Sequence, residues 1–158
     1  MKASDGNTNR REFLAAGGVG AALLLAAGKT QAADSVISTA EKANEKVVNE
    51  FCVAWETMDI DKIASFLDDE IVFRMIDDAP FTEGKQAVID GIGPFLSNLK
   101  SARFEMLRSV AMGNIVVNDR IDHFGKEDGS SNAYHITGVF KVKNGKIVEW
   151  RDYMMPTG

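Results

Sequence analysis

The amino-acid sequence predicts an α+β domain in which helices are segregated to one face of a largely antiparallel sheet. Apolar residues recur at helical spacing through much of the chain up to residue 99. From Ala102 onward the pattern changes to the two-residue alternation that is typical of strands. Asn144-Gly145 separates two of these alternating runs and is a strong signal for a hairpin turn. The predicted order of elements is therefore helix, helix, strand, helix and four further strands.

Three helices are predicted in the first half of the domain. The first runs from about Val36 to Met58, and Asp59 is placed to cap a second, short helix. The third runs from about Gly84 to Leu99. The apolar residues expected on the buried sides of the three helices are Val47, Val48, Phe51, Cys52, Trp55, Ile63, Phe66, Leu67, Val88, Ile89, Ile92, Phe95, Leu96 and Leu99.

Five strands are predicted, one between the second and third helices and four after the third. The first covers residues 71–76 and is followed by a turn at 77–80 that contains a proline. The other four cover residues 102–112, 114–124, 132–143 and 146–154. Because short turn signals separate most of the last four, consecutive strands are expected to pair antiparallel.

Residues 1–33 are predicted to be an export signal, so the folded domain is expected to span residues 34–158. Arg10-Arg11 and the residues that follow resemble the twin-arginine export signal. The apolar run after them has about 15 residues, which is short of the roughly 20 that a membrane span needs. Small residues before Asp34 match a signal-peptidase site. We therefore expect a periplasmic or secreted protein that meets the membrane only transiently during export.

Charge and cysteine content limit the function classes. The chain from residue 34 onward carries 14 Lys and Arg against 21 Asp and Glu, a net charge of −7. This negative charge argues against nucleic acid and anionic membrane surfaces as partners. Cys52 is the only cysteine, so no disulfide framework and no zinc spacing exists. It lies in an apolar helical stretch, where a thiol is expected to be a small buried packing residue.

Two charged motifs lie within predicted strands. Arg120 and Asp122 share one face of strand 114–124, and Asp152 lies on an otherwise apolar face of strand 146–154. A carboxylate in an apolar wall is costly unless it is paired, and burial raises its pKa toward the range of a general base. Arg120 is the candidate partner. Two other interpretations remain open at this point, namely a structural ion-pair network and an exposed polar strand face.

Four short segments carry a resemblance to a known family: Asp-Arg-Ile-Asp at 119–122, Gly-Val-Phe at 138–140, Gly-Lys-Ile at 145–147 and Trp-Arg-Asp-Tyr at 150–153. With these, the chain from about Val47 to Met154 resembles the limonene-1,2-epoxide hydrolase family, within the cone-shaped nuclear-transport-factor-2-like (SnoaL-like) folds. The resemblance implies a curved, antiparallel-rich sheet with three helices from the N-terminal half packed on one face around an apolar pocket. It also implies a homodimer, because the fold group commonly pairs through the open face of its sheet.

The resemblance implies a one-step hydrolysis of a small apolar epoxide without metal or cofactor. Asp152 would be the general base that deprotonates a water, and Asp122, protonated, would donate to the epoxide oxygen. Arg120 would lie between the two carboxyl groups. Two nearby carboxyls in a dry pocket split their pKa values, which provides one acid and one base.

The sequence departs from the family where the attacking water is held. The family's first strand supplies a Tyr and an Asn for this purpose, and the matching positions here are Phe73 and Met75. Tyr134, which the resemblance places on the cavity side, is either a compensating donor or an ordinary rim tyrosine. The expected pocket walls are Trp55, Phe73, Met75, Phe95, Leu99, Phe124, Tyr134, Ile136, Trp150 and Met154. His123 and His135 fall on the opposite strand parity and are not expected in the site.

Two alternatives to an exported epoxide hydrolase remain open. One is an isomerase or polyketide-type cyclase that uses the same carboxylates, since a proton shuttle needs no held water. The other is a non-enzymatic module that binds a hydrophobic small molecule.

Overall fold

The computed structural model describes residues 37–156, which form the domain discussed below. Its elements, in chain order, are α1 (Thr39–Ala54), the short 3-10 helix η1 (Trp55–Thr57), α2 (Ile60–Ala64), β1 (Leu67–Arg74), β2 (Thr82–Glu83), α3 (Lys85–Ser97), β3 (Ser101–Met112), β4 (Ile115–Gly125), β5 (Ser131–Lys143) and β6 (Lys146–Met154). The predicted order of helices and strands is confirmed. The predicted export signal and its cleavage site lie outside the described residues.

The strands form one open, mixed sheet in the order β2-β1-β6-β5-β4-β3. The last four strands pair antiparallel with their neighbours in sequence, as their turns predicted. The first strand differs from the prediction in two respects. It begins at Leu67 instead of residue 71, and it pairs in parallel with β6. A two-residue strand that the sequence did not indicate, β2, completes the edge.

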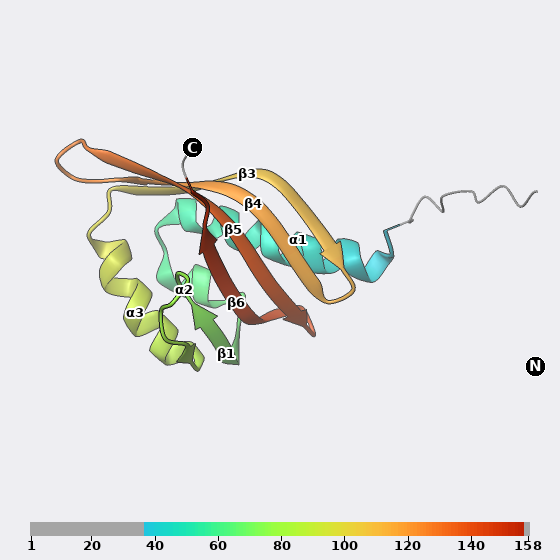
Figure 1. Ribbon diagram of the computed structural model, residues 1–158. Helices are drawn as coiled ribbons and strands as arrows, with labels where there is room; N and C mark the ends of the chain where they lie inside the picture. The colour runs from blue at the N-terminus through green and yellow to red at the C-terminus, as the bar shows by residue number, and fades with distance from the viewer. Residues whose placement is uncertain (1–36, 157–158) are drawn as a thin grey trace, which may run out of the picture. The chain divides into compact units, whose positions relative to one another are not determined.

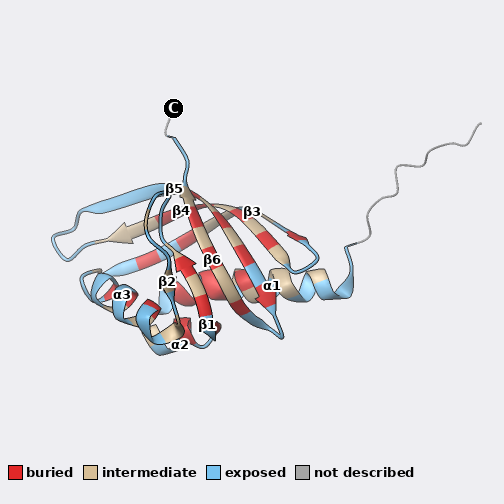
Figure 2. Cartoon of the chain, turned by 60° about the horizontal axis from the view of Figure 1, so that its bottom comes forward, coloured by how far each residue is buried: buried red, intermediate tan, exposed pale blue. Residues whose placement is uncertain are grey.

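All three α-helices cover the same face of the sheet, with α1 running under β3 to β6 and α3 beside β1 (Figure 1). Buried residues alternate along the strands and gather on the sides of the helices that meet them (Figure 2). Val48, Phe51 and Cys52 of α1 are buried in this core together with Phe140 and Trp150 from the sheet. The helices and the inner sheet face therefore enclose the hydrophobic core of the described residues, and the outer sheet face is left open.

Local signals explain where the first two helices begin. Ser38 and Glu41 form a capping box at the start of α1, each accepting from the other's backbone N–H. Asp59 caps α2, as predicted, by accepting from the backbone N–H groups of Asp61 and Lys62. None of the helices in the described residues is long and apolar enough to cross a membrane.

Candidate active site

The inner face of the sheet brings together the three charged residues that the sequence singled out. Nε and Nη2 of Arg120 donate to the two carboxylate oxygens of Asp122 at 2.8 and 3.1 Å. The same Nη2 donates to Oδ2 of Asp152 at 2.7 Å. Arg120 is fully buried, and Asp122 and Asp152 are 4% and 6% exposed. The interpretation as an exposed strand face is therefore wrong, because all three groups lie inside the domain.

Asp152 has a second hydrogen-bond donor on its own strand. The indole Nε1 of Trp150 donates to Oδ1 of Asp152 at 2.9 Å. The carboxylate thus accepts one charged and one neutral N–H, one at each oxygen. Both bonds favour its ionised form and fix the direction of its remaining lone pairs.

On the side away from the two carboxyls, Arg120 donates to a neutral acceptor. Its Nη1 donates to Oδ1 of Asn118 at 3.0 Å, and the backbone N–H of Gly138 donates to the same oxygen at 3.2 Å. The guanidinium also lies over the ring of Phe104, with its Cζ 4.9 Å from the centroid. Asn118 shares the strand parity of Arg120 and Asp122, but sequence reasoning gave it no role.

Burial shifts the proton affinities of the two carboxyl groups in the same direction. Desolvation raises the pKa of Asp122 to about 6, although Arg120 opposes the shift. Desolvation also raises the pKa of Asp152, against Arg120 and the Trp150 hydrogen bond. Because one guanidinium cannot neutralise two buried carboxylates, the pair is expected to retain one proton over an interval of pH. The site can therefore present an acid and a base together.

A cavity of about 250 Å³ opens onto the two carboxyl groups. It is small for a ligand site and suits a small ligand. Of the ten expected wall residues, nine line it: Trp55, Phe73, Met75, Phe95, Phe124, Tyr134, Ile136, Trp150 and Met154. The prediction that Leu99 lines the cavity is wrong. Helix α3 ends at Ser97, so Leu99 has left the helical phase and packs against the core instead. Ile76, Ile92 and Phe104 line the cavity without having been predicted.

Phe73 and Met75 are apolar in their setting as well as in their side chains. The ring of Phe73 lies 4.2 Å from that of Trp150, and Met75 is 45% exposed at the cavity mouth. Tyr134 is 37% exposed, which makes it a rim residue of the cavity. The wall side chains supply three kinds of polar group: the two carboxyls, the indole N–H groups and the hydroxyl of Tyr134.

The other candidate groups lie away from this cavity. His123 contacts Glu105 at 2.9 Å and His135 contacts Asp119 at 2.6 Å, in both cases on the outer sheet face. Cys52 is buried, and desolvation raises the pKa of its thiol to about 12, so it is not a nucleophile. Within residues 37–156 there is no cluster of three or more His, Cys, Asp or Glu that could hold a metal ion.

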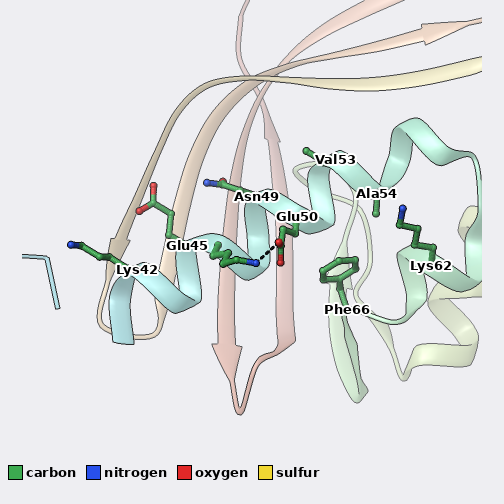
Figure 3. A pocket seen from close by; sticks show the side chains of 9 residues that line it. Lys42, Glu45, Asn49, Glu50, Val53, Ala54, Lys62 and Phe66 are labelled. Atoms are coloured by element: carbon green, nitrogen blue, oxygen red, sulfur yellow. Dashed lines mark hydrogen bonds and ion pairs between the residues drawn. The ribbon is translucent and has the colours of Figure 1, made fainter. Parts of the chain in front are cut away.

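A second hollow, of about 680 Å³, runs along the exposed side of α1 (Figure 3). Charged side chains dominate its walls, among them the ion pair of Lys46 and Glu50, and Phe66 contributes a ring. None of the residues of the buried carboxyl pair contributes to it. The candidate active site is therefore the smaller cavity, onto which Asp122 and Asp152 open.

A family model for the SnoaL-like domain matches residues 48–150. Among solved structures, the chain is similar to an epoxide hydrolase of limonene-epoxide-hydrolase type from M. tuberculosis, with 22% identity over 73% of this chain and 84% of that chain and a TM-score of 0.66. It is also similar to a protein assigned as a SnoaL-like polyketide cyclase from Jannaschia (12% identity, 74% and 88% covered, TM-score 0.65). A nuclear-transport-factor-2-like protein of unknown function from Burkholderia pseudomallei matches similarly (18%, 72% and 91%, TM-score 0.62). These matches confirm the predicted nuclear-transport-factor-2-like α+β fold.

Proposed function

The chain belongs to the SnoaL-like domain family, and from that premise we propose that it is an epoxide hydrolase acting on a small apolar epoxide. The fold group includes epoxide hydrolases, cyclases and isomerases, so the family alone leaves the reaction open. The observation that carries the proposal is the single nitrogen, Nη2 of Arg120, that bonds both carboxyl groups at one end of the cavity. This arrangement supports joint action of an acid and a base on one small molecule.

In the proposed reaction, ionised Asp152 takes a proton from a water whose oxygen attacks one epoxide carbon. The bond from that carbon to the epoxide oxygen breaks, and protonated Asp122 donates its proton to the oxygen as it leaves. The product is a diol, and the two carboxyls return to their starting states by proton exchange with solvent. Arg120 keeps its charge throughout, since the two aspartates raise its pKa more than burial lowers it.

The acid and base roles in this proposal follow the family resemblance of the two motifs. Each carboxyl accepts two N–H bonds: Asp152 accepts one from Arg120 and one from Trp150, and Asp122 accepts two from Arg120. The pKa of about 6 allows Asp122 to hold a proton near neutrality. The apolar walls supply no further charge, so the cavity favours a substrate whose reacting oxygen is its main polar group.

The test is to incubate the protein with terpene and cycloalkene oxides in ¹⁸O-labelled water and to measure labelled diol. We expect one labelled oxygen per diol and a loss of at least about a thousandfold in Asp152→Asn, since the general base is removed. Asp119→Asn is the matched control, because Asp119 lies on the outer sheet face and contacts His135. Diol at the background rate, or diol formation that survives Asp152→Asn, contradicts the proposal.

Phe73 and Met75 favour a second candidate, an isomerase or cyclase that uses the same carboxylates. In this reaction Asp152 removes a proton next to a carbonyl and Asp122 donates a hydrogen bond to the carbonyl oxygen, so no water needs to be held. Deuterium uptake from D₂O into a cyclic ketone, without hydrolysis, supports it. If neither turnover occurs and Asp122→Asn changes only the unfolding free energy, the domain is a binding module for an apolar ligand.

We propose that residues 1–33 direct export by the twin-arginine route. The test is to fuse this segment to a fluorescent reporter that folds in the cytoplasm and to measure its release from the periplasm. The expected result is export that is abolished when Arg10 and Arg11 are both replaced by Lys. Export that persists in that variant contradicts the proposal.

A further inference from the structure

Asn118 on β4 is a buried polar residue that the proposed reaction does not use. It is 1% exposed and lies two residues before Arg120, on the same face of the strand. Its amide oxygen accepts from Nη1 of Arg120 and from the backbone N–H of Gly138. Its amide nitrogen donates to Sγ of Cys52, on α1, at 3.6 Å. The Asn118 side chain therefore links helix α1, strands β4 and β5, and the guanidinium of Arg120.

The orientation of this amide is fixed by its neighbours. Arg120 and Gly138 present N–H groups, which require an acceptor, and the sulfur of Cys52 is a weak acceptor that requires a donor. The reversed amide would set its NH₂ group against two donors and leave both unsatisfied in the core. The end of Arg120 that faces away from the carboxyls thus has one stable arrangement.

We propose that Asn118 is a positioning residue for the carboxyl pair, which it acts on through Arg120. By holding Nη1, it keeps the edge formed by Nε and Nη2 turned toward Asp122 and Asp152. This inference rests on the proposed function of the pair. Among the described residues, Asn118 is the acceptor to which Nη1 donates, and the guanidinium is otherwise flanked by the rings of Phe104 and Phe140, whose centroids lie 4.9 and 6.0 Å from its Cζ.

The neutrality of Asn118 matters as much as its geometry. The titratable groups around Arg120 are Asp122 on its own strand, Asp152 on β6 and Cys52 on α1. The thiol is neutral because burial raises its pKa, so the guanidinium shares its charge between two carboxyls only. A carboxyl at position 118 would compete for that charge and hold an additional proton in the cluster. An amide supplies the same acceptor without this competition.

The experiment follows the side-chain carboxyl ¹³C resonances of Asp122 and Asp152 as a function of pH, without substrate. The resonances are assigned with the variants Asp122→Asn and Asp152→Asn. Asn118→Leu keeps the branch at Cγ but is larger than Asn and has no acceptor. We expect the titration of Asp122 to move upward by about one pH unit, because a guanidinium that is free to rotate neutralises the carboxyl less. Where a substrate turns over, kcat is expected to fall by about tenfold or more with KM little changed. Val116→Ala, at a buried apolar position on the same strand face, is the control.

Asn118→Asp keeps an oxygen that can accept from both Arg120 and Gly138, and it provides the test if the Leu variant does not fold. We expect its added carboxyl to titrate together with Asp122, so that the last proton leaves the cluster about one pH unit later than in the wild type. A carboxyl that titrates independently, near pH 4, overturns the proposal. So does a Leu variant whose titrations superimpose on the wild type, or a Val116→Ala variant that shifts them equally. Because no substrate is present, a shifted titration without any diol formation counts against the proposed function alone.

Discussion

Arg120 on β4 and Asp152 on β6 are hydrogen-bonded at 2.7 Å although β5 lies between their strands. The β5 residue paired with Asp152 on one side and with Asn118 on the other is Gly138. Because it has no side chain, the guanidinium can cross the strand directly above its backbone. The bridge between the two carboxyls therefore depends on a glycine that contributes no chemistry of its own.

Replacing Gly138 by Ala is expected to break this bridge. A Cβ there would overlap Nη1 of Arg120 and lie 2.5 Å from Oδ1 of Asn118 and 2.6 Å from the Phe140 ring. The buried network would have to shift, so we expect a loss of about 2 kcal/mol or more in unfolding free energy, measured by urea denaturation, and loss of turnover. Gly91→Ala on α3, where a Cβ meets nothing within 4 Å, is the control and is expected to be neutral or stabilising. Equal stability of both variants would contradict the packing argument.

The unfolding free energy of the domain is expected to decrease as the pH rises from about 4 to about 6. Burial raises the pKa of Asp122 from 3.8 to about 6, so the folded state binds the proton more tightly than the unfolded state does. This contribution is fully present below pH 3.8 and is lost as the pH rises through 6; it is on the order of 2–3 kcal/mol. Urea denaturation from pH 4 to 8 measures it. In Asp122→Asn the decline should be shallower, and an identical pH dependence would exclude Asp122 as its source.

Turnover is expected to decline above about pH 6, the pKa to which burial raises Asp122, because the general acid is then ionised. The decline should approach tenfold per pH unit in kcat/KM. Initial rates of diol formation between pH 5 and 9 measure it. Asp119→Asn should keep the same profile, since Asp119 pairs with His135 on the outer face. A rate that is constant to pH 9 would show that Asp122 does not act as the acid.

The charged site could be predicted from the sequence because it depends on local patterns. The alternation along β4 places Arg120 and Asp122 on one face, and the hairpin at Asn144-Gly145 makes β5 and β6 antiparallel neighbours. Asp152 was recognised because it interrupts an apolar face. These relationships involve neighbours in sequence or strands joined by short turns.

The features of the fold and site that the sequence did not predict depend on contacts between distant parts of the chain, which leave no local sequence pattern. The parallel pairing of β1 with β6 joins residues far apart in the chain, and nothing near Phe73 indicates that Trp150 will be its neighbour. Asn118 was on the correct face, but its role follows from Cys52 and Gly138, which the fold alone brings together. Leu99 was misplaced because the helical period was extended past the end of α3.

Two copies of the domain are expected to pair through the outer sheet face. Val110, Val117 and Val139 lie side by side there across β3, β4 and β5, and Leu107 and Met112 are exposed on the same edge strand. Apolar surface of this kind is typical of an interface. Sedimentation velocity should show a dimer, and Val110→Lys should shift it toward monomer. Val53→Lys, on the exposed side of α1, should leave the dimer unchanged; a wild-type monomer at micromolar concentration would contradict the proposal.

Restoring polar groups beside Asp152 should reveal whether water is the second substrate. Phe73 and Met75 line the cavity, and neither can orient a water for Asp152. In the double variant Phe73→Tyr, Met75→Asn we expect diol formation to rise by about tenfold or more, because a held water is already aligned for attack. Phe73→Tyr, Met75→Leu restores only one of the two groups and should gain less. If the double variant forms no more diol but still exchanges deuterium into a ketone, the carboxyl pair moves protons on the substrate itself and water is not its partner.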